Sequence, residues 1–322
     1  MCIRDSAQTL QVGKLVAFME YLFHAMFSVM LFCMVFMLYP RASISAKRIM
    51  AVLNTETSIE NHPGNAQTDS GSGEHSVIFE HVDFVYPDGE EAVLKDISFS
   101  AKSGETVAFI GSTGSGKSSL IQLIPRFYDR ASGNIYIDGQ KIEDLDINAL
   151  RSKIGFVPQK AHLFSGTIEE NIRFGKPDAT MDEIIHAAKI AQAYDFIMEK
   201  PHQFQEQIVE GATNVSGGQK QRLSIARALI RKPEIYIYDD SFSALDFKTD
   251  ARLRKALKPE IKNAIVFLVA QRVSTILDAD KIVVLDEGKI AGIGTHRELL
   301  ASCPIYYEIA ASQLSKEELT YA

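Results

Sequence analysis

The chain has 322 residues, of which 46% are hydrophobic, and a formal net charge of -7 at pH 7. This composition is that of a globular protein with a sizeable core, and the acidic balance argues against a nucleic-acid-binding surface, which usually carries a basic stripe. The cysteines Cys2, Cys33 and Cys303 lie far apart and form no CxxC pair, so the sequence indicates neither a disulfide framework nor a zinc site. A reducing cytoplasm suits most of the chain.

The N-terminal part of the sequence is strongly apolar. Residues 15–39 read LVAFMEYLFHAMFSVMLFCMVFMLY, interrupted only by Glu20 and His24 among strongly polar types. A helix of this length spans about 37 Å, and the hydrocarbon core of a bilayer is about 30 Å thick. A signal peptide has a shorter apolar stretch and a small-residue cleavage site, and a buried helix of a large soluble protein is the remaining alternative. The segment therefore predicts a membrane-spanning helix.

The polar residues around this helix predict how it would lie in a bilayer. Glu20 and His24 are four residues apart on one helical face, so we expect that face to meet protein or a water-filled cavity. The basic residues at positions 41, 47 and 48 favour a cytoplasmic C-terminal end, although those at positions 4 and 14 weaken this preference.

Changes in amino-acid composition and hydrophobic periodicity divide the rest of the chain. Helical periodicity continues from residue 41 to residue 54. Residues 61–76 (NHPGNAQTDSGSGEHS) offer almost nothing to bury, which predicts a linker. Short β-rich runs then alternate with helical stretches, which predicts an α/β domain with a largely parallel central sheet and an antiparallel portion early on. The predicted parts are a leader that does not read as native (1–6), the membrane helix with its extension (7–60), the linker (61–76), the α/β domain (77–315) and a tail (316–322).

A glycine-rich loop at residues 111–119, GSTGSGKSS, follows the predicted strand 106–110 and opens a helix. It matches G-x-x-x-x-G-K-[ST], whose glycines let successive backbone N–H groups point at phosphate oxygens. Lys117 should reach the β- and γ-phosphates, and the Ser118 hydroxyl should hold Mg²⁺, which predicts ATP and Mg²⁺ as ligands. The alternative is a glycine-rich turn without nucleotide, which the strand–loop–helix context disfavours. The predicted nucleotide-binding residues here are Gly111, Ser112, Thr113, Gly114, Ser115, Gly116, Lys117, Ser118 and Ser119.

The second half of a phosphate site is a hydrophobic strand that ends in a carboxylate. Residues 234–239 (EIYIYD) supply such a strand, and Asp239 would hold Mg²⁺ through water. Many strands end in Asp, so this pattern gains its weight from the loop upstream.

With these two motifs in place, residues from about 77 to about 313 resemble the nucleotide-binding domain of ABC exporters. Residues 214–219 (NVSGGQ) resemble the family signature and run into the helical sequence KQRLSIARALIRK. Ser216 can cap that helix, and Gly217 and Gly218 permit close backbone approach. The resemblance implies that this segment, including Gln219, faces the γ-phosphate of ATP bound to another subunit, so that two such domains enclose two nucleotides.

The resemblance implies a P-loop NTPase fold with a parallel core sheet, an antiparallel β portion and a helical subdomain that carries the signature. The apolar segment upstream resembles the last transmembrane helix of an exporter half and its cytoplasmic extension. Three further roles carry over. Tyr86 would stack on adenine, although an aromatic residue at a strand end is usually packing. Gln159 would touch Mg²⁺ and report to the membrane domain. Asp246 would belong to the loop that crosses to the opposite site, although alone it reads as a helix cap.

Two positions depart from the family pattern. Exporters normally place Glu directly after the strand aspartate, where it polarises the attacking water, whereas this chain has Asp240, whose side chain is one methylene shorter. A misplacement of about 1 Å can cost around a hundredfold in rate. The family also normally has His in the loop after the next strand, where this chain has Gln271, a neutral amide. The next histidine downstream, His296, lies in a different motif and reads as structural.

Both changes fall on one nucleotide site, so Asp240, Gln271 and Gln159 predict a catalytic set with slow turnover, while the signature remains intact. We therefore favour a heterodimer over a homodimer: this chain holds ATP at a slow site and completes a fast site of its partner. The resemblance implies a second half-transporter, a lipid bilayer, an unidentified transported substrate and no nucleic acid as partners. It also implies a bacterial plasma-membrane protein, multi-pass in its full-length form, with the nucleotide-binding domain in the cytoplasm.

Two alternatives remain. One is a soluble ATPase of the same superfamily that works in DNA repair or translation. The other is a truncated fragment without transport activity, because exporter halves carry six transmembrane helices and this sequence predicts one.

Overall fold

The structure is a computed structural model that describes residues 12–55, 57, 59, 61, 75–314 and 319. The chain divides into two compact units, residues 1–58 and residues 59–322. The expected leader (1–6), most of the expected linker and most of the expected tail lie outside the described residues.

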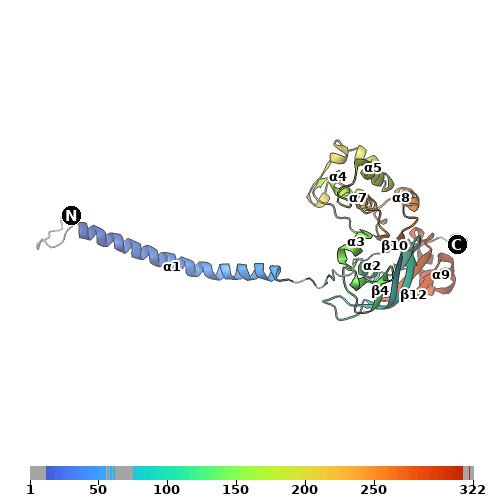
Figure 1. Ribbon diagram of the computed structural model, residues 1–322, viewed down its shortest axis with the longest axis horizontal. Coiled ribbons are helices and arrows are strands. Elements are labelled where there is room, and N and C mark those ends of the chain that lie inside the picture. Colours follow the sequence, from blue (N-terminus) through green and yellow to red (C-terminus); the bar gives the residue numbers. More distant parts are fainter. Residues whose placement is uncertain are drawn as a thin grey trace. The chain divides into compact units, whose positions relative to one another are not determined.

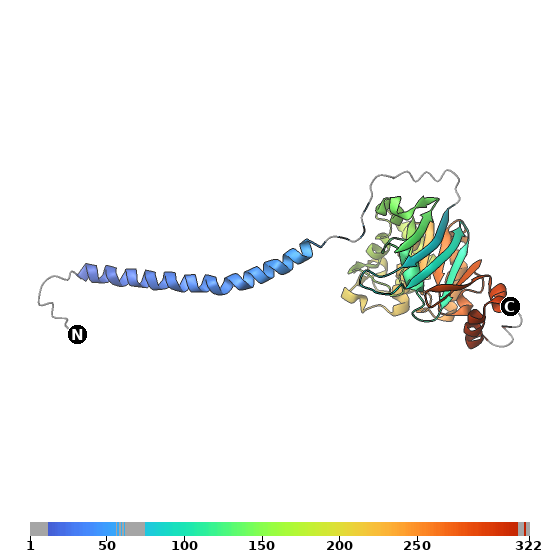
Figure 2. The same cartoon turned by 90° about the horizontal axis from the view of Figure 1, so that it is seen from below.

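The described part of the first unit contains one helix, α1 (Val12–Leu53), in which no residue is buried. Pro40 lies inside this helix, so the apolar stretch and its polar extension form one element of 42 residues. Figure 2 shows this element as one continuous coiled ribbon. By length and composition α1 could cross a membrane, and no other described helix meets the same test. Its large side chains are exposed, with Phe23 and Phe36 each 68% accessible, so α1 needs apolar surroundings that this unit does not itself supply.

Two main sheets build the second unit. A four-stranded antiparallel sheet has the order β2-β1-β4-β5, and a six-stranded sheet has the order β12-β11-β3-β10-β9-β6, in which the β11–β12 pair is antiparallel and the other neighbours are parallel. This arrangement confirms the predicted α/β domain with a largely parallel core and an early antiparallel portion. The strands are β1 (Ser76–Phe84), β2 (Leu94–Lys102), β3 (Thr106–Gly111), β4 (Ser132–Ile137), β5 (Gln140–Lys141), β6 (Ile154–Val157), β7 (Gly166–Thr167), β8 (Gln207–Ile208), β9 (Ile235–Asp239), β10 (Ile265–Val269), β11 (Lys281–Asp286) and β12 (Lys289–Gly294).

Helices pack on both faces of the six-stranded sheet, and the four-stranded sheet shares one of these faces. Every residue of β9 and β10 is buried, as expected for parallel strands packed on both faces. Side chains alternate along β9, so Ile235 and Ile237 join one core cluster while Tyr236 and Tyr238 join the other. The helices are α2 (Lys117–Leu123), α3 (Ile147–Ser152), α4 (Ile168–Arg173), α5 (Met181–Ile190), α6 (Tyr194–Met198), α7 (Gly217–Leu229), α8 (Phe247–Glu260), α9 (His296–Ser302) and α10 (Pro304–Gln313).

The helices α4, α5 and α7 gather into a helical part to one side of the strands (Figure 1). Their starts follow from the sequence, because α4 and α5 each begin with a reciprocal capping box, Thr167 with Glu170 and Thr180 with Glu183. This helical part carries the signature segment, as the resemblance implies.

The fold begins slightly before residue 77, where the domain was expected to start. Ser76 is the first residue of β1 and pairs with Lys102, and the His75 N–H donates a hydrogen bond to the Ser103 hydroxyl at 2.8 Å. Hydrogen bonds of this kind depend on partners that are distant in the sequence. The polar composition of residues 61–76 therefore placed residues 75 and 76 in the predicted linker.

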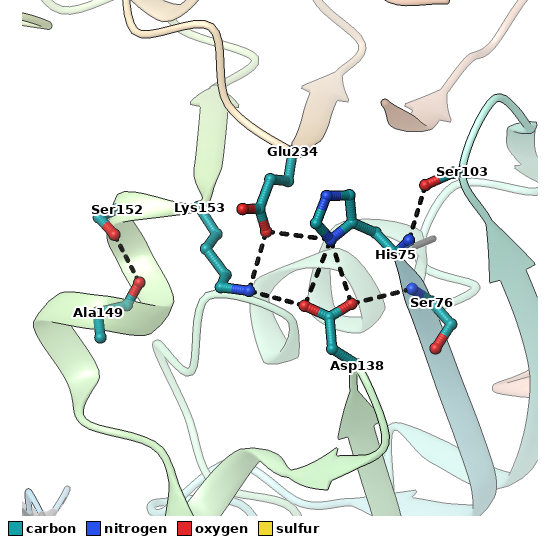
Figure 3. A network of polar contacts seen from close by, with 8 residues as sticks. All are labelled: His75, Ser76, Ser103, Asp138, Ala149, Ser152, Lys153 and Glu234. Carbon is teal, nitrogen blue, oxygen red and sulfur yellow. Dashed lines mark hydrogen bonds and ion pairs between the residues drawn. The ribbon is translucent and has the colours of Figure 1, made fainter. Parts of the chain in front are cut away.

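A polar cluster beside this point joins the two main sheets (Figure 3). Lys153 Nζ lies 2.7 Å from a carboxylate oxygen of Asp138 and 3.0 Å from one of Glu234, and His75 Nδ1 lies 3.3–3.4 Å from both acids. Ligand atoms of the histidine and the two acids all lie within 4.8 Å of one another, a spacing that a metal ion could use. Because Lys153 already pairs with both carboxylates, the cluster is an ion-pair network that links the start of β1, the turn after β4 and the starts of β6 and β9.

Candidate nucleotide site

The loop between β3 and α2 has a backbone that only glycine permits at its key positions. Gly114 and Gly116 have φ values of +84° and +95°. A Cβ on Gly111 would lie 2.0 Å from the carbonyl oxygen of Leu285, and a Cβ on Gly116 would lie 2.6 Å from Leu94 Cδ2. The loop can therefore curl against its neighbours only because these side chains are absent.

Lys117 is the first residue of α2, and its ammonium group folds back over the loop. It donates hydrogen bonds to the carbonyl oxygens of Gly111 (3.0 Å) and Ser112 (2.6 Å) and to Ser115 Oγ (3.2 Å). Burial lowers the pKa of Lys117, and the nearby Asp240 and Asp239 carboxylates oppose that shift. A cation held by neutral oxygens above a glycine-rich loop is free to exchange them for anionic ones.

Ser118 and Asp239 come together from two motifs 121 residues apart. The Ser118 hydroxyl donates a hydrogen bond of 2.9 Å to Asp239 Oδ1, and Asp239 ends β9 with 5% of its surface exposed. Burial raises the pKa of Asp239, and the hydrogen bond from Ser118 and the charge of Lys117 oppose that rise. A hydroxyl and a carboxylate at this spacing are the hard oxygen donors that Mg²⁺ prefers, so the residues fit the predicted ion.

The three predicted catalytic residues meet at one oxygen atom. Asp240 Oδ2 accepts a hydrogen bond from the side-chain amide of Gln271 at 2.6 Å and another from that of Gln159 at 3.2 Å. Asp240 has a φ of +46°, which is unusual for a residue with a side chain and fixes its direction at the strand end. Burial raises the pKa of Asp240, and the hydrogen bond from Gln159 opposes that rise.

Tyr86 lies beside the phosphate loop. Its hydroxyl is hydrogen-bonded to Ser119 Oγ at 2.8 Å, and its ring packs edge-on against those of Phe84 and Tyr128. The packing expected of a strand-end aromatic is therefore present, and stacking on adenine stays a prediction.

The signature segment begins α7. Ser216 Oγ accepts the Gln219 N–H, and the Gln219 side chain accepts the Ser216 N–H in return, so the expected helix cap is confirmed. Asp246 likewise caps α8 by accepting the Thr249 N–H at 3.0 Å. Among the described residues, no hydrogen bond or ion pair joins residues 216–219 or Asp246 to the phosphate loop at 111–119. Their roles toward nucleotide stay predictions.

Two residues outside the predicted set clarify this site. His296 is buried and hydrogen-bonds Tyr306 at 2.6 Å, which confirms the structural reading of that histidine. Gln313, at the end of α10, contacts the backbone of the loop that carries Gln271. Sequence analysis missed Gln313 because no local pattern distinguishes it from other glutamines near a helix end.

Comparison with known proteins agrees with this geometry. Residues 94–243 match the family model described as ABC transporter. A Bacillus subtilis protein described as an uncharacterized ABC transporter ATP-binding protein is 44% identical over 307 residues, covering 95% of this chain and 52% of the relative. A Staphylococcus aureus protein whose name includes multidrug export ATP-binding/permease protein is 48% identical over 237 residues, covering 74% of this chain and 41% of the relative.

A solved structure of a bacterial Atm1-family ABC exporter with ATP bound matches with a TM-score of 0.83 and 33% identity, covering 97% of this chain and 54% of that one. The chain spans about half the length of the relatives that it matches. These likenesses and the loop–strand geometry agree: the chain carries an ABC transporter ATP-binding domain with the P-loop NTPase fold, preceded by one apolar helix.

Proposed function

We propose that this chain is the ATP-binding and ATP-hydrolysing part of an exporter subunit. The observation that carries the proposal is the convergence of Lys117, Ser118 and Asp239, which come from two separate motifs. The exporter names of the relatives and the exposed apolar surface of α1 support membrane transport over the alternative of a soluble ATPase of the same superfamily.

The residues of the binding half have distinct tasks. Lys117 exchanges its contacts with loop carbonyls for β- and γ-phosphate oxygens, and the glycine backbone lets N–H groups approach those phosphates. Ser118 and Asp239 hold Mg²⁺, which neutralises charge on the phosphates when bound. Tyr86 covers the adenine side, and Gln159 lies close enough to Asp240 to sense the state of the site.

The hydrolysing half is slow. Its carboxylate is one methylene shorter than the glutamate of the family pattern, and the two side-chain amides that orient it, those of Gln159 and Gln271, carry no charge. The raised pKa of Asp240 favours a role as general base. Its shorter side chain, however, places the carboxylate farther from an attacking water and so orients that water poorly. Gln271 stabilises transition-state charge only as a neutral donor.

Because the signature segment Ser216–Gln219 is intact, we propose that it completes the active site of a second half-transporter. In that heterodimer Asp246 lies in the loop that crosses toward the partner, and the partner's own phosphate loop forms the fast site. Substrate contacts then belong to membrane helices of the pair, of which α1 is one.

The test measures ATP binding and turnover by the full chain in detergent, with and without Asp240→Glu plus Gln271→His. We expect the native chain to bind ATP and turn over slowly, and the double substitution to raise turnover by about tenfold or more. Asp286→Glu lengthens a carboxylate at the end of β11, a strand of the same sheet that does not pair with β9, and serves as the matched control, which should change nothing.

Two results would contradict parts of the proposal. Native turnover equal to that of the double variant would remove the slow-site reading and with it the reason for a heterodimer. Failure to bind ATP at all would remove the nucleotide site itself.

A further inference from the structure

The C-terminal helical hairpin is fixed firmly to the six-stranded sheet. Tyr306 and Ala310 of α10 are fully buried, Leu299 of α9 is 1% exposed, and the Tyr306 hydroxyl is hydrogen-bonded to His296 Nδ1. The last residue of α10 therefore has a defined position, and that residue is Gln313.

Gln313 makes two hydrogen bonds to the loop after β10. Its Nε2 donates to the carbonyl oxygen of Gln271 at 2.9 Å, and its Oε1 accepts the Val273 N–H at 2.8 Å. Arg272, between them, has an extended backbone with φ -106° and ψ 127°. A neighbouring parallel strand uses this same pair of groups, the C=O and N–H that flank one extended residue. The side-chain amide thus replaces a strand where the sheet pairing of β10 has ended.

The side chain of Gln271 leaves this clamped backbone and donates to Asp240 Oδ2 at 2.6 Å. A continuous chain of contacts therefore runs from α10 through Gln313 and the backbone of residues 271–273 to the carboxylate at the end of β9. Nothing else in the described hydrogen bonds fixes the Gln271 carbonyl, so its position depends on Gln313.

We propose that Gln313 is a positioning residue for ATP hydrolysis: it holds the loop of Gln271 so that this side chain meets Asp240 and the γ-phosphate. This inference rests on the proposed function, because Gln313 can affect turnover in this way only if Gln271 takes part in ATP hydrolysis. A side chain displaced by about 1 Å can lose a large part of its catalytic effect, and two hydrogen bonds set that displacement here.

The experiment is a double-substitution cycle in the full chain, with Gln313→Ala, Gln271→Ala and both together. Turnover, ATP affinity and melting temperature are measured for each. We expect Gln313→Ala to lower turnover about threefold to tenfold with ATP affinity changed less than about twofold. In the Gln271→Ala background the same change should lower turnover less than about 1.5-fold, because residues that act through one another are not additive.

Two further variants sharpen the cycle. Gln313→Glu keeps an acceptor for the Val273 N–H but sets a carboxylate against the Gln271 carbonyl, so it should lose turnover as Gln313→Ala does. Ser312→Ala is the matched control, because Ser312 is hydrogen-bonded within its own helix and should leave turnover unchanged.

A merely structural role for Gln313 gives a different result: a fall in melting temperature and an equal fractional loss of turnover in both backgrounds. That result overturns the proposal, and so does a Gln313→Ala chain with native turnover. The cycle compares the turnover of each variant with that of its parent chain. Its result therefore does not depend on whether native turnover is slow or fast. A failure of the slow-site proposal is seen separately, in the Asp240→Glu plus Gln271→His comparison.

Discussion

Strand β9 has a polar cluster at each end, and the two clusters are built in opposite ways. At its start, Glu234 and Asp138 share Lys153 at 3.0 and 2.7 Å, with His75 beside them (Figure 3). At its end, Asp239 and Asp240 are buried and receive hydrogen bonds from neutral hydroxyl and amide donors. Within the described part of the chain, neither of these two aspartates forms an ion pair.

The ionisation of the clusters follows this difference. Burial pushes the pKa of Asp138 upward, but hydrogen bonds from Lys153 and the Ser76 N–H outweigh it, so that pKa is lowered. Burial prevails at Asp239 and Asp240, whose pKa values are raised. The first cluster stabilises the fold by pairing its own charges. The second leaves negative charge in a poorly solvated place, where a cation with its ligand can compensate it.

The largest expected effect comes from removing the ammonium group of Lys117, whose charge acts on both carboxylates of the second cluster. Lys117→Met should weaken ATP binding at least about 100-fold, because the charged contact to the phosphates is lost while the methionine stem still fills the space. Equilibrium binding of a fluorescent ATP analogue to the full chain measures this effect. Lys141→Met, an exposed lysine of β5, is the matched control. Unchanged affinity in Lys117→Met would place the nucleotide elsewhere.

The next effect breaks the first cluster. Lys153→Met should lower the free energy of unfolding by about 1–2 kcal/mol, because two partly buried carboxylates lose their shared cation. Urea unfolding followed by circular dichroism measures it, and Lys160→Met, which removes an exposed lysine, should have no effect. If Lys153→Met matched the control, the network would be no more than a surface ion pair.

A smaller effect, on the free energy of unfolding, is expected from a substitution in the middle of β9, between the two clusters. The Tyr238 hydroxyl is buried on β9 and has no hydrogen-bond partner among the described residues, and burial raises its pKa well above the ordinary value. Tyr238→Phe should raise the free energy of unfolding by about 1 kcal/mol, because an unsatisfied polar group is removed without a change of shape. Tyr236→Phe, two residues earlier with a parallel ring, is the control and should give a smaller gain. A loss of stability in Tyr238→Phe would mean that the hydroxyl has a partner in solution.

The smallest effect sets the two ends of β9 directly against each other. Without nucleotide, Asp240→Asn should raise stability by about 0.5 kcal/mol at neutral pH, because it removes a buried charge at a functional site. Asp138→Asn should lower it, because that carboxylate is paired. The same direction of change for both variants would contradict the distinction between the two clusters.

The pH dependence should separate the same two variants. Asp138 has a lowered pKa, so its contribution is present above the ordinary value of 3.8 and is lost as the pH falls through its folded-state pKa. Asp240 has a raised pKa, so the folded chain binds more protons there than the unfolded chain, and stability falls as the pH rises through that value. Melting temperatures from about pH 4 to pH 8 should therefore show the gain from Asp240→Asn growing with pH.

Local patterns determined much of this protein. The glycine-rich loop, the carboxylate at the end of β9, the caps at Ser216 and Asp246 and the run of apolar residues in α1 were all predicted from short stretches of sequence. Each of these features depends on residues close to it in the sequence, through backbone conformation, short-range hydrogen bonds or hydropathy. A short stretch of sequence is therefore enough to predict it. The pairing of β2, β6 and β12 cannot be predicted from their residues alone, because their burial depends on which partners the sheet supplies.

Tertiary structure alone decided the contacts between distant segments. Gln159 and Asp240 are 81 residues apart, His75 and Asp138 are 63 apart, and Gln313 reaches a carbonyl 42 residues before it. The resemblance placed the first pair at one site, but no pattern in the sequence pointed to the other two. The residues next to a glutamine or histidine in the sequence do not indicate its hydrogen-bond partner. That partner is determined by how the strands and helices pack in the tertiary structure. The sequence thus determined which chemical groups this protein possesses, and the packing of its sheets decided which carboxylates are paired and which remain available to a nucleotide.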